Sequence, residues 1–254
     1  MKLEVRGVSK SFGGLAALSD VSFDVNERAI FGLIGPNGAG KTTLFNVMTG
    51  VYPPDTGSIR FGGAELSRLR PARIAAAGVG RTFQNIRLFA QLTVLENLLV
   101  ACEIEKTAHL AAALLRLPSH YEDEARMRTR ALDLLEVFGL RSVADAPSTS
   151  LPYGSQRRLE IARAMMLSPK LLLLDEPAAG LNAAEADALG TQVRWLRDEL
   201  AVAVVLVEHN VQLVMGVCER ILVLDHGESI AEGTPTEIRS DPKVVAAYLG
   251  EGGS

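Results

Sequence analysis

Residues 35–42 read Gly-Pro-Asn-Gly-Ala-Gly-Lys-Thr, and this stretch decides the fold of the chain. It matches the phosphate-loop pattern G-x-x-x-x-G-K-[ST], with an apolar run over residues 29–34 before it and a helical pattern over residues 43–48 after it. The glycines permit backbone conformations in which successive N–H groups surround a phosphate. A glycine-rich turn with a solvated lysine is the alternative, but the predicted strand and helix on either side favour phosphate binding.

The loop predicts a site for a nucleoside triphosphate and Mg²⁺. Lys41 would reach the β- and γ-phosphates, and the Thr42 hydroxyl would take one position on the metal ion. A helix that begins near Lys41 adds the positive end of its dipole. Phe12 stands in a turn before the loop, where an aromatic ring either folds back on the core or stacks on a purine. The predicted nucleotide-binding residues are Phe12, Gly35, Pro36, Asn37, Gly38, Ala39, Gly40, Lys41, Thr42 and Thr43.

Composition indicates a globular chain. Of its 254 residues, 48% are hydrophobic and 22% are charged, which is enough to bury the core of one large domain or two joined lobes. The formal net charge of −4 gives no indication of a nucleic-acid partner. Cys102 and Cys218 lie far apart without metal-ligand spacing, so we expect two buried apolar residues. No run approaches the ~20 apolar residues that span a bilayer, so we expect a cytosolic chain or one held at a membrane by a partner.

Hydrophobic patterning predicts antiparallel and parallel strands. Alternation over residues 2–8 and 21–25 indicates two half-buried strands of an antiparallel sheet. The four leucines at 171–174 are typical of the centre of a parallel sheet that is covered on both faces. Further strands are expected at residues 58–61, 79–83, 203–207 and 220–224, and helices at 71–77, 157–167, 185–199, 210–218 and 242–249.

The pattern changes between residues 86 and 166, where long amphipathic stretches replace the strand-like runs. We therefore expect an inserted helical lobe. Helical spacing is clearest over residues 94–100 and 131–138, whereas residues 107–130 are polar and irregular. His109 and His120 lie in this irregular piece and are expected to be exposed to solvent.

Polar side chains follow three of the predicted strands. Asp175 and Glu176 come directly after the four leucines, and Gln84 and His209 each follow another strand. Open α/β sheets bind ligands at the carboxyl edge of their strands. Asp175 is therefore predicted to hold the Mg²⁺ shell and Glu176 to polarise the attacking water, while Gln84 and His209 would reach the same phosphate. Singly, each of these residues has an ordinary structural explanation, such as a helix cap or a solvated surface residue; their shared position favours catalysis.

In this order the motifs resemble the ATP-binding subunits of ABC transporters over nearly the whole chain. Phe12 stands at the position of the family's adenine-stacking aromatic, Gln84 at that of the glutamine that touches Mg²⁺ and the transmembrane partner, and His209 at that of the switch histidine. Residues 151–156 occupy the signature position. The resemblance implies ATP and Mg²⁺ as cofactors and ATP hydrolysis as the reaction, with Glu176, His209 and Gln84 as catalytic residues and Thr42, Gln84 and Asp175 at the metal.

The resemblance also implies a dimer in which each signature helix presents its N-terminus to the ATP held by the opposite subunit. Tyr153, Gly154, Ser155 and Gln156 would make that contact. Compared with the common form Leu-Ser-Gly-Gly-Gln, Tyr153 replaces the serine and Ser155 the second glycine, which leaves the Gly154 and Ser155 N–H groups as the main contacts. Asn182 replaces the usual aspartate of the loop after the acidic pair.

Residues 81–85, 153–164, 175–182 and 247–250 are similar to those of the ATPases of bacterial branched-chain amino acid uptake systems. The implied function is to power a membrane importer of branched-chain amino acids or related amino acids and amides. The implied partners are integral-membrane permease subunits, a second ATPase subunit and, indirectly, a solute-binding protein, with no nucleic acid. The implied location is the inner face of the cell membrane, through the permease. The ATPase of a lipid or lipopolysaccharide exporter and a soluble non-transport ABC ATPase are the alternatives.

The expected fold is an α/β P-loop NTPase of the ABC type, with a mixed sheet core, an N-terminal antiparallel β subdomain and an inserted α-helical subdomain. Residues 1–254 would form a single ABC ATPase domain. Lobes 1–85 and 167–254 would make the RecA-like core and the antiparallel β part, and residues 86–166 the helical subdomain that carries the signature.

Overall fold

The computed structural model describes residues 1–103 and 118–249, and the chain divides into two compact units. Unit 1 comprises Met1–Arg81, Lys170–Ala179 and Ala186–Ser254, and unit 2 comprises Thr82–Pro169 and Gly180–Glu185. The expected exposure of His109 and His120 concerns side chains that lie outside the described part. Cys102 and Cys218 are both buried, as expected.

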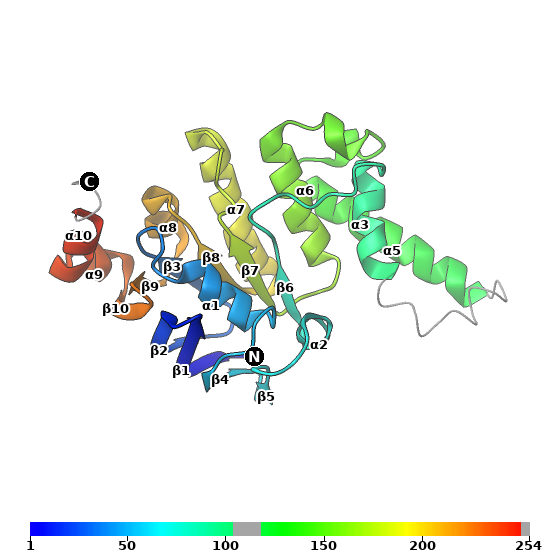
Figure 1. Ribbon diagram of the computed structural model, residues 1–254. Helices are drawn as coiled ribbons and strands as arrows, with labels where there is room; N and C mark the ends of the chain where they lie inside the picture. The colour runs from blue at the N-terminus through cyan, green and yellow to red at the C-terminus, as the bar shows by residue number, and fades with distance from the viewer. Residues whose placement is uncertain (104–117, 250–254) are drawn as a thin grey trace. The chain divides into compact units, whose positions relative to one another are not determined.

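One sheet of unit 1 is antiparallel and consists of β1 (Leu3–Phe12), β2 (Leu15–Val25), β4 (Thr56–Phe61) and β5 (Ala64–Glu65), in the order β2-β1-β4-β5 (Figure 1). Leu3, Val5 and Val8 bury one face of β1. Both β1 and β2 are longer than the sequence predicts, because only Gly13 and Gly14 form the turn between them. Register shifts between Val5 and Val8 and beyond break the alternation, so the pattern ends before the strand does.

The other sheet of unit 1 has the order β10-β9-β3-β8-β7-β6, and its strands are β3 (Ile30–Ile34), β6 (Val79–Arg81), β7 (Leu171–Asp175), β8 (Ala203–Val207), β9 (Arg220–Asp225) and β10 (Glu228–Gly233). All neighbouring strands are parallel except β9 and β10. β3, β7 and β8 are buried along their whole length, which explains why the sequence reads as unbroken apolar runs there. The mixed sheet beside an antiparallel sheet confirms the predicted fold class.

The helices that lie wholly or mostly in unit 1 are α1 (Lys41–Met48), α2 (Pro71–Ala76), α7 (Ala183–Leu200), α8 (Val211–Val217), α9 (Pro235–Ser240) and α10 (Pro242–Leu249). The core of this unit joins α1 to both sheets. Phe23 of β2 and Phe31 of β3 stack with ring centroids 5.2 Å apart, and Phe45 of α1 is buried in the same cluster. The helix that follows the phosphate loop is therefore fixed along its inner face.

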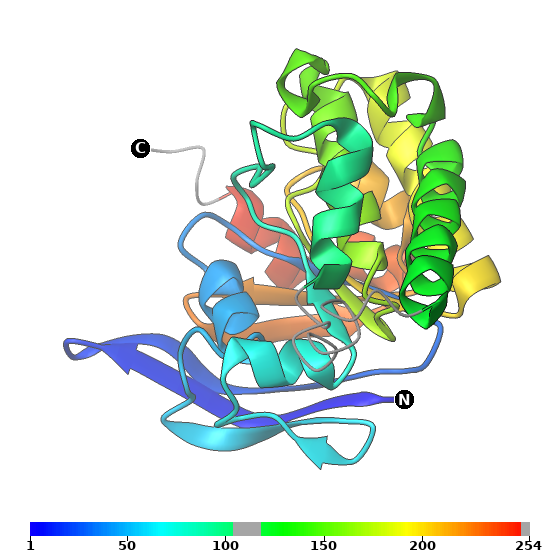
Figure 2. The ribbon, with the colours of Figure 1, turned by 90° about the vertical axis from the view of Figure 1, so that its right-hand side faces the viewer.

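Unit 2 contains α3 (Val94–Glu103), α5 (Pro118–Val137), α6 (Tyr153–Met165) and the short 3-10 turns Arg141–Val143 and Ser148–Ser150. Figure 2 shows α3 and α5, in teal and green, side by side. The prediction of irregular structure up to residue 130 is wrong, because α5 already begins at Pro118. Nearly all of residues 123–130 are exposed, so no apolar stripe marks this part of the helix in the sequence. Among the described residues, none of the helices combines the length and the apolar character that crossing a bilayer requires.

The strand predicted over residues 79–83 ends at Arg81. Beyond it, the N–H and C=O groups of Phe83 bond to side chains of α6 instead of a neighbouring strand. The sequence predicts that Gln84 directly follows a strand, and this is wrong. Gln84 lies in a segment of unit 2, and Thr82 and Phe83 separate it from the strand end at Arg81. Side-chain partners from residues far along the chain decide this boundary, and a local pattern cannot reveal them.

The buried parallel strands predict a large difference between two leucine substitutions. Leu173 of β7 is 0% exposed and Leu15 of β2 is 72% exposed. Leu173→Ala should lower the free energy of unfolding by about 2–5 kcal/mol through lost burial and a cavity. Leu15→Ala should change it by less than about 0.5 kcal/mol. Urea unfolding followed by circular dichroism measures both, and equal effects would contradict the assignment of β7 to the core.

Candidate functional site

The phosphate loop follows β3 and runs against the backbone of a neighbouring strand. Gly35 has φ 150°, and a Cβ atom there would lie 2.0 Å from the carbonyl oxygen of Leu224 in β9. Gly38 and Gly40 also have positive φ values. Only glycine fits the first of these positions, since any side chain would displace the end of β9. The loop is therefore held in the conformation that the motif predicts for a backbone cradle.

Lys41 places its amine inside this loop. Nζ donates to the carbonyl oxygens of Gly35 and Pro36 at 2.6 and 2.7 Å, and the residue is 5% exposed. Gly40 is the N-cap residue of α1, and Thr42 in the first turn is exposed. The first N–H groups of a helix have no partner within the helix, so they add donors to the same place. The charge, the donors and the glycine backbone together suit a phosphate.

Glu176 and His209 are brought together where β7 and β8 end. The distance between Glu176 Oε1 and His209 Nε2 is 2.8 Å. Glu176 has φ 47°, an unusual value for a residue with a side chain, and its N–H donates to the carbonyl oxygen of Val207 at 2.8 Å. This backbone bond fixes the first residue after β7 to the last residue of β8. Glu176 and His209 are thus two of the predicted site residues that lie in direct contact.

Glu208, which precedes His209, has a carboxylate surrounded by backbone donors. Its oxygens accept from the N–H groups of Ala178 at 2.6 Å, His209 at 3.1 Å and Asn210 at 3.2 Å. Burial raises the pKa of Glu208, and the negative charge of Glu176 acts in the same direction. Sequence patterning did not single out this residue, although an acidic residue directly after a buried strand is a usable signal.

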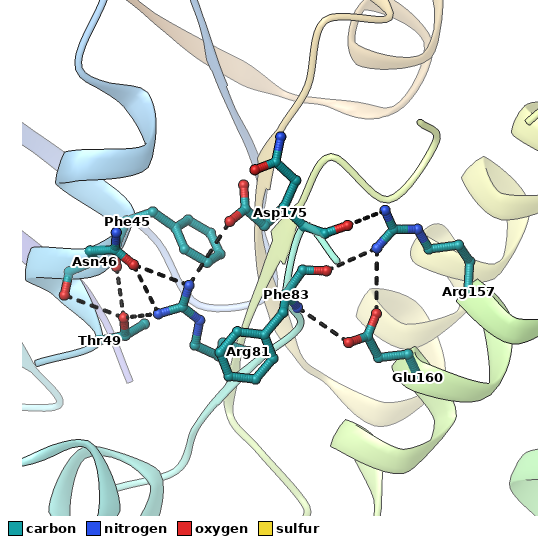
Figure 3. Close-up of polar contacts among 9 residues, drawn as sticks. Phe45, Asn46, Thr49, Arg81, Phe83, Arg157, Glu160 and Asp175 are labelled. Atoms are coloured by element: carbon teal, nitrogen blue, oxygen red, sulfur yellow. Dashed lines mark hydrogen bonds and ion pairs between the residues drawn. The ribbon is translucent and has the colours of Figure 1, made fainter. Parts of the chain in front are cut away.

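Arg81 connects Asp175 to the helix after the phosphate loop (Figure 3). Its guanidinium donates to Asn46 Oδ1 on α1 at 3.2 Å and to Oγ1 of Thr49, the C-cap residue of α1, at 2.5 Å. It lies 3.9 Å from Asp175 Oδ2 and 4.9 Å from the centre of the Phe45 ring. Asp175, the predicted metal ligand, is therefore buried beside a cation that is itself fixed to α1. The sequence analysis missed Arg81, because only the fold brings β6 beside α1 and β7.

Phe12 lies on the surface rather than in the core. It is 41% exposed, and its ring meets that of Tyr52 edge to face with centroids 5.2 Å apart. Lys10 Nζ lies 5.5 Å from the same ring. Of the two alternatives that the sequence left open, packing into the core is excluded, and an aromatic surface remains that a purine ring can stack on.

The signature segment opens α6 in unit 2. The helix begins at Tyr153 and not at residue 157 as predicted, and Pro152 is its N-cap residue. Proline has no side-chain acceptor, and no side-chain cap bond forms at this helix start. The N–H of Ser155, expected to be a main contact for ATP, donates to the carbonyl oxygen of Pro152 at 2.9 Å.

The loop of residues 180–185 packs against this turn within unit 2. A Cβ atom on Gly154 would lie 2.8 Å from Glu185 Oε1, so the glycine permits a close approach. Asn182 Oδ1 accepts from the Glu185 N–H, and Glu185 Oε2 accepts from the Asn182 N–H, each at 3.0 Å. Asn182 therefore starts α7 through a reciprocal cap, a role that aspartate fills equally well.

Arg157 of α6 holds the segment that contains Gln84. Its guanidinium donates to the carbonyl oxygen of Phe83 at 2.8 Å (Figure 3). It also donates to the carbonyl oxygen of Gln84 and to the Tyr153 hydroxyl, the latter at 3.0 Å. It also lies 3.5 Å from Glu160, which is buried and accepts from the Phe83 N–H. Burial raises the pKa of Glu160, against the opposing charge of Arg157. The tyrosine of the signature and the backbone of Gln84 thus share one buried cation.

Comparison with known proteins gives consistent matches. Residues 18–179 match the family model described as ABC transporter, and residues 228–254 match the model described as branched-chain amino acid ATP-binding cassette transporter. The high-affinity branched-chain amino acid transport ATP-binding protein BraF of Pseudomonas aeruginosa is 47% identical over 249 residues, which cover 98% of this chain and 98% of BraF.

Two further proteins are similar over the same length. The lipopolysaccharide export system ATP-binding protein LptB of Escherichia coli is 37% identical over 249 residues, which cover 98% of this chain and 97% of LptB. The crystal structure of the ADP conformation of MJ1267, an ATP-binding cassette of an ABC transporter, matches with a TM-score of 0.85 at 32% identity, covering 98% of this chain and 99% of that chain.

The Arg157–Glu160 pair predicts a stability effect. Arg157→Met removes the cation 3.5 Å from the buried Glu160 and leaves only the weaker effect of Arg163, so it should lower the free energy of unfolding by about 3–5 kcal/mol. Arg126→Met is the matched control, because Arg126 pairs with Asp123 on an exposed surface of α5, and it should cost less than about 1 kcal/mol. Urea unfolding at pH 7 compares the two. Equal losses would show that the buried pair does not hold α6 to the segment with Gln84.

Proposed function

Since this chain belongs to the ABC transporter family and is an ATPase of the ABC type, we propose that it powers a membrane importer of branched-chain amino acids or related amino acids and amides. Its fold is the α/β P-loop fold of that family. The substrate class rests on sequence identity. Over 249 residues the chain is 47% identical to BraF but only 37% identical to LptB. The match of residues 228–254 supports the same choice. Lipopolysaccharide export and a soluble role outside transport are therefore the weaker alternatives.

In the proposed reaction the loop of residues 35–43 binds the triphosphate of ATP, and Phe12 receives the adenine. Lys41 shifts from the loop carbonyls to the β- and γ-phosphates. Thr42 and Asp175 hold Mg²⁺, which neutralises charge on the phosphates when it is bound. The exposed hydroxyl of Thr42 and the buried carboxylate of Asp175 offer the oxygen ligands that this ion prefers.

Glu176 orients the attacking water and takes its proton. His209 keeps the Glu176 carboxylate in place through the 2.8 Å contact, and the His209 side chain also reaches the γ-phosphate. Gln84 would offer its amide oxygen to Mg²⁺ and would sense the permease. Tyr153, Gly154, Ser155 and Gln156 meet the ATP of a second ATPase subunit, where the dipole of α6 favours negative charge. The whole chain acts as one ABC ATPase domain, with lobes 1–85 and 167–254 as core and residues 86–166 as helical subdomain.

The proposed partners follow from this assignment. Integral-membrane permease subunits hold the chain on the inner face of the cell membrane, a second ATPase subunit of the same or a sister kind completes both ATP sites, and a solute-binding protein delivers the cargo to the permease. The ATPase makes no contact with the cargo in this arrangement. The substrate class thus rests on relatives alone and needs a test of its own.

Two substitutions separate ATP binding from hydrolysis. Glu176→Gln should leave the affinity for a fluorescent ATP analogue within about threefold of the original, and lower kcat by about 100-fold or more, because the amide cannot take a proton. Lys41→Ala should abolish binding itself. Equilibrium titration and a phosphate-release assay with Mg²⁺ measure the two effects. Undiminished turnover by Glu176→Gln would remove Glu176 from its proposed role.

The cargo is tested in proteoliposomes that contain the chain with the permease and ATPase subunits encoded beside its gene. Leucine, isoleucine or valine, with their binding protein, should raise ATP hydrolysis by about threefold or more and enter the vesicles, because importers couple cargo arrival to subunit closure. Proteoliposomes with Glu176→Gln serve as the control for ATP dependence. Stimulation by lipopolysaccharide instead of amino acids would overturn the proposed substrate class and leave the ATPase assignment intact.

A further inference from the structure

Glu208 has no part in the reaction proposed above, yet it lies beside the residues that do. It follows β8 directly and precedes His209. One carboxylate oxygen accepts from the N–H of Ala178, and the other accepts from the N–H groups of His209 and Asn210. Ala178 belongs to the loop after β7, two residues beyond Glu176. A single side chain therefore joins the loop that carries Glu176 to the turn that carries His209.

The burial of this carboxylate requires an explanation. Glu208 is 3% exposed, and no basic side chain in the described part of the chain forms an ion pair with it. Burying an ionised carboxylate without a cation is costly unless hydrogen bonds compensate for the lost water. Here three backbone N–H groups provide them. An apolar residue in the same space would leave these three N–H groups without their acceptor, so packing alone does not account for an acid.

The contacts close a ring around the Glu176–His209 pair. On one side, Glu176 Oε1 meets His209 Nε2 at 2.8 Å. On the other side, the Glu208 carboxylate ties the Ala178 N–H to the His209 N–H. Between them, the Glu176 N–H donates to the carbonyl oxygen of Val207 at 2.8 Å. Without Glu208, the backbone of His209 keeps its link to β8 but loses its link to the loop after β7.

We propose that Glu208 is a positioning residue, which fixes the backbone of His209 at the register where its imidazole meets the Glu176 carboxylate. This role rests on the proposed function, because it affects turnover only if Glu176 and His209 act on ATP. The start of α8 has a cap of its own, since Asn210 Oδ1 accepts from the Leu213 N–H, and Glu208 adds one bond to the N–H of Asn210. Loss of Glu208 should therefore disturb the contact between the loops before it disturbs the helix.

Steady-state kinetics of the full chain with Mg²⁺ and ATP give the first readout. Glu208→Ala and the nearly isosteric Glu208→Gln should each lower kcat by about tenfold or more and leave KM for ATP within about threefold, because the phosphate loop is untouched. Glu208→Gln is included because it fills the same volume and folds where Glu208→Ala does not. Glu237→Gln is the matched control, since Glu237 also accepts a backbone N–H, that of Thr234, but at the start of α9. It should keep the original kcat.

A double-mutant cycle separates positioning from a general structural effect. If Glu208 acts through His209, Glu208→Gln should cause no further loss of kcat in a chain that already carries His209→Ala. The melting temperature, in contrast, should fall in both backgrounds. If the fold-loss of kcat in the double variant equals the product of the two single losses, the proposal is overturned. A folded Glu208→Gln chain with a kcat within about twofold of the original would overturn it as well.

A third readout does not depend on catalysis. The chain has four histidines, and His209→Ala identifies the ring resonances of His209 in a ¹⁵N-histidine NMR spectrum. Glu208→Gln should shift those resonances toward their values in Glu176→Gln, because one change moves the imidazole away from the Glu176 carboxylate and the other replaces that carboxylate by an amide. Glu237→Gln should leave them in place. Unshifted His209 resonances would refute the positioning role. If the original chain hydrolysed no ATP, the proposed function would fail while this spectrum still decided the role of Glu208.

Discussion

The pairing of backbone groups in fully buried parallel strands is the constraint on which the site depends. Inside such a sheet every N–H and C=O must bond to a neighbouring strand, so the sequence of β3, β7 and β8 stays apolar until the ladder ends. Because β8 lies between β3 and β7 and all three are parallel, their carboxyl ends share one edge. The phosphate loop, the acidic pair and the turn with His209 therefore occupy neighbouring positions at that edge, although they are far apart in the sequence.

The charges at this edge are each met by protein groups. Each charged side chain has its own partners. Lys41 donates to the carbonyls of Gly35 and Pro36, and Asp175 lies beside Arg81. Glu176 contacts His209, and Glu208 accepts from three backbone N–H groups. In the proposed reaction Lys41 exchanges its two carbonyl partners for phosphate oxygens, whereas the three carboxylates already have partners that hold them in place. Such an arrangement also explains why several of these groups tolerate burial.

The sequence predicted the elements with strong local signals and missed those that depend on distant partners. The apolar runs of β3, β7 and β8 and the glycines of the phosphate loop gave their positions directly. The end of β6 was placed too late, because side chains of α6 take the hydrogen bonds of Phe83. The first half of α5 was missed, because a helix with nearly all of its side chains in water shows no apolar stripe.

The site shows the same division. Candidates that end an apolar run, such as Asp175, Glu176 and His209, are visible in one dimension, since the run itself marks the edge of the sheet. Arg81 and Arg157 are not, because each acquires its partners only when separate segments meet. Glu208 also ends an apolar run, but its link to the Ala178 N–H appears only in the fold. Their residue types are ordinary in the sequence. A buried charge becomes informative only once its burial is known.

The backbone of Glu176 has a consequence for how this position can change over evolutionary time. At φ 47° a glycine or asparagine would cause less backbone strain than the glutamate that occupies the position. Glycine or asparagine here can relieve backbone strain while it removes the carboxylate that the proposed reaction uses, so a screen for heat resistance alone would tend to select chains without the proposed base. The φ angle of Glu176 therefore sets folding stability at this position against the proposed role of its carboxylate.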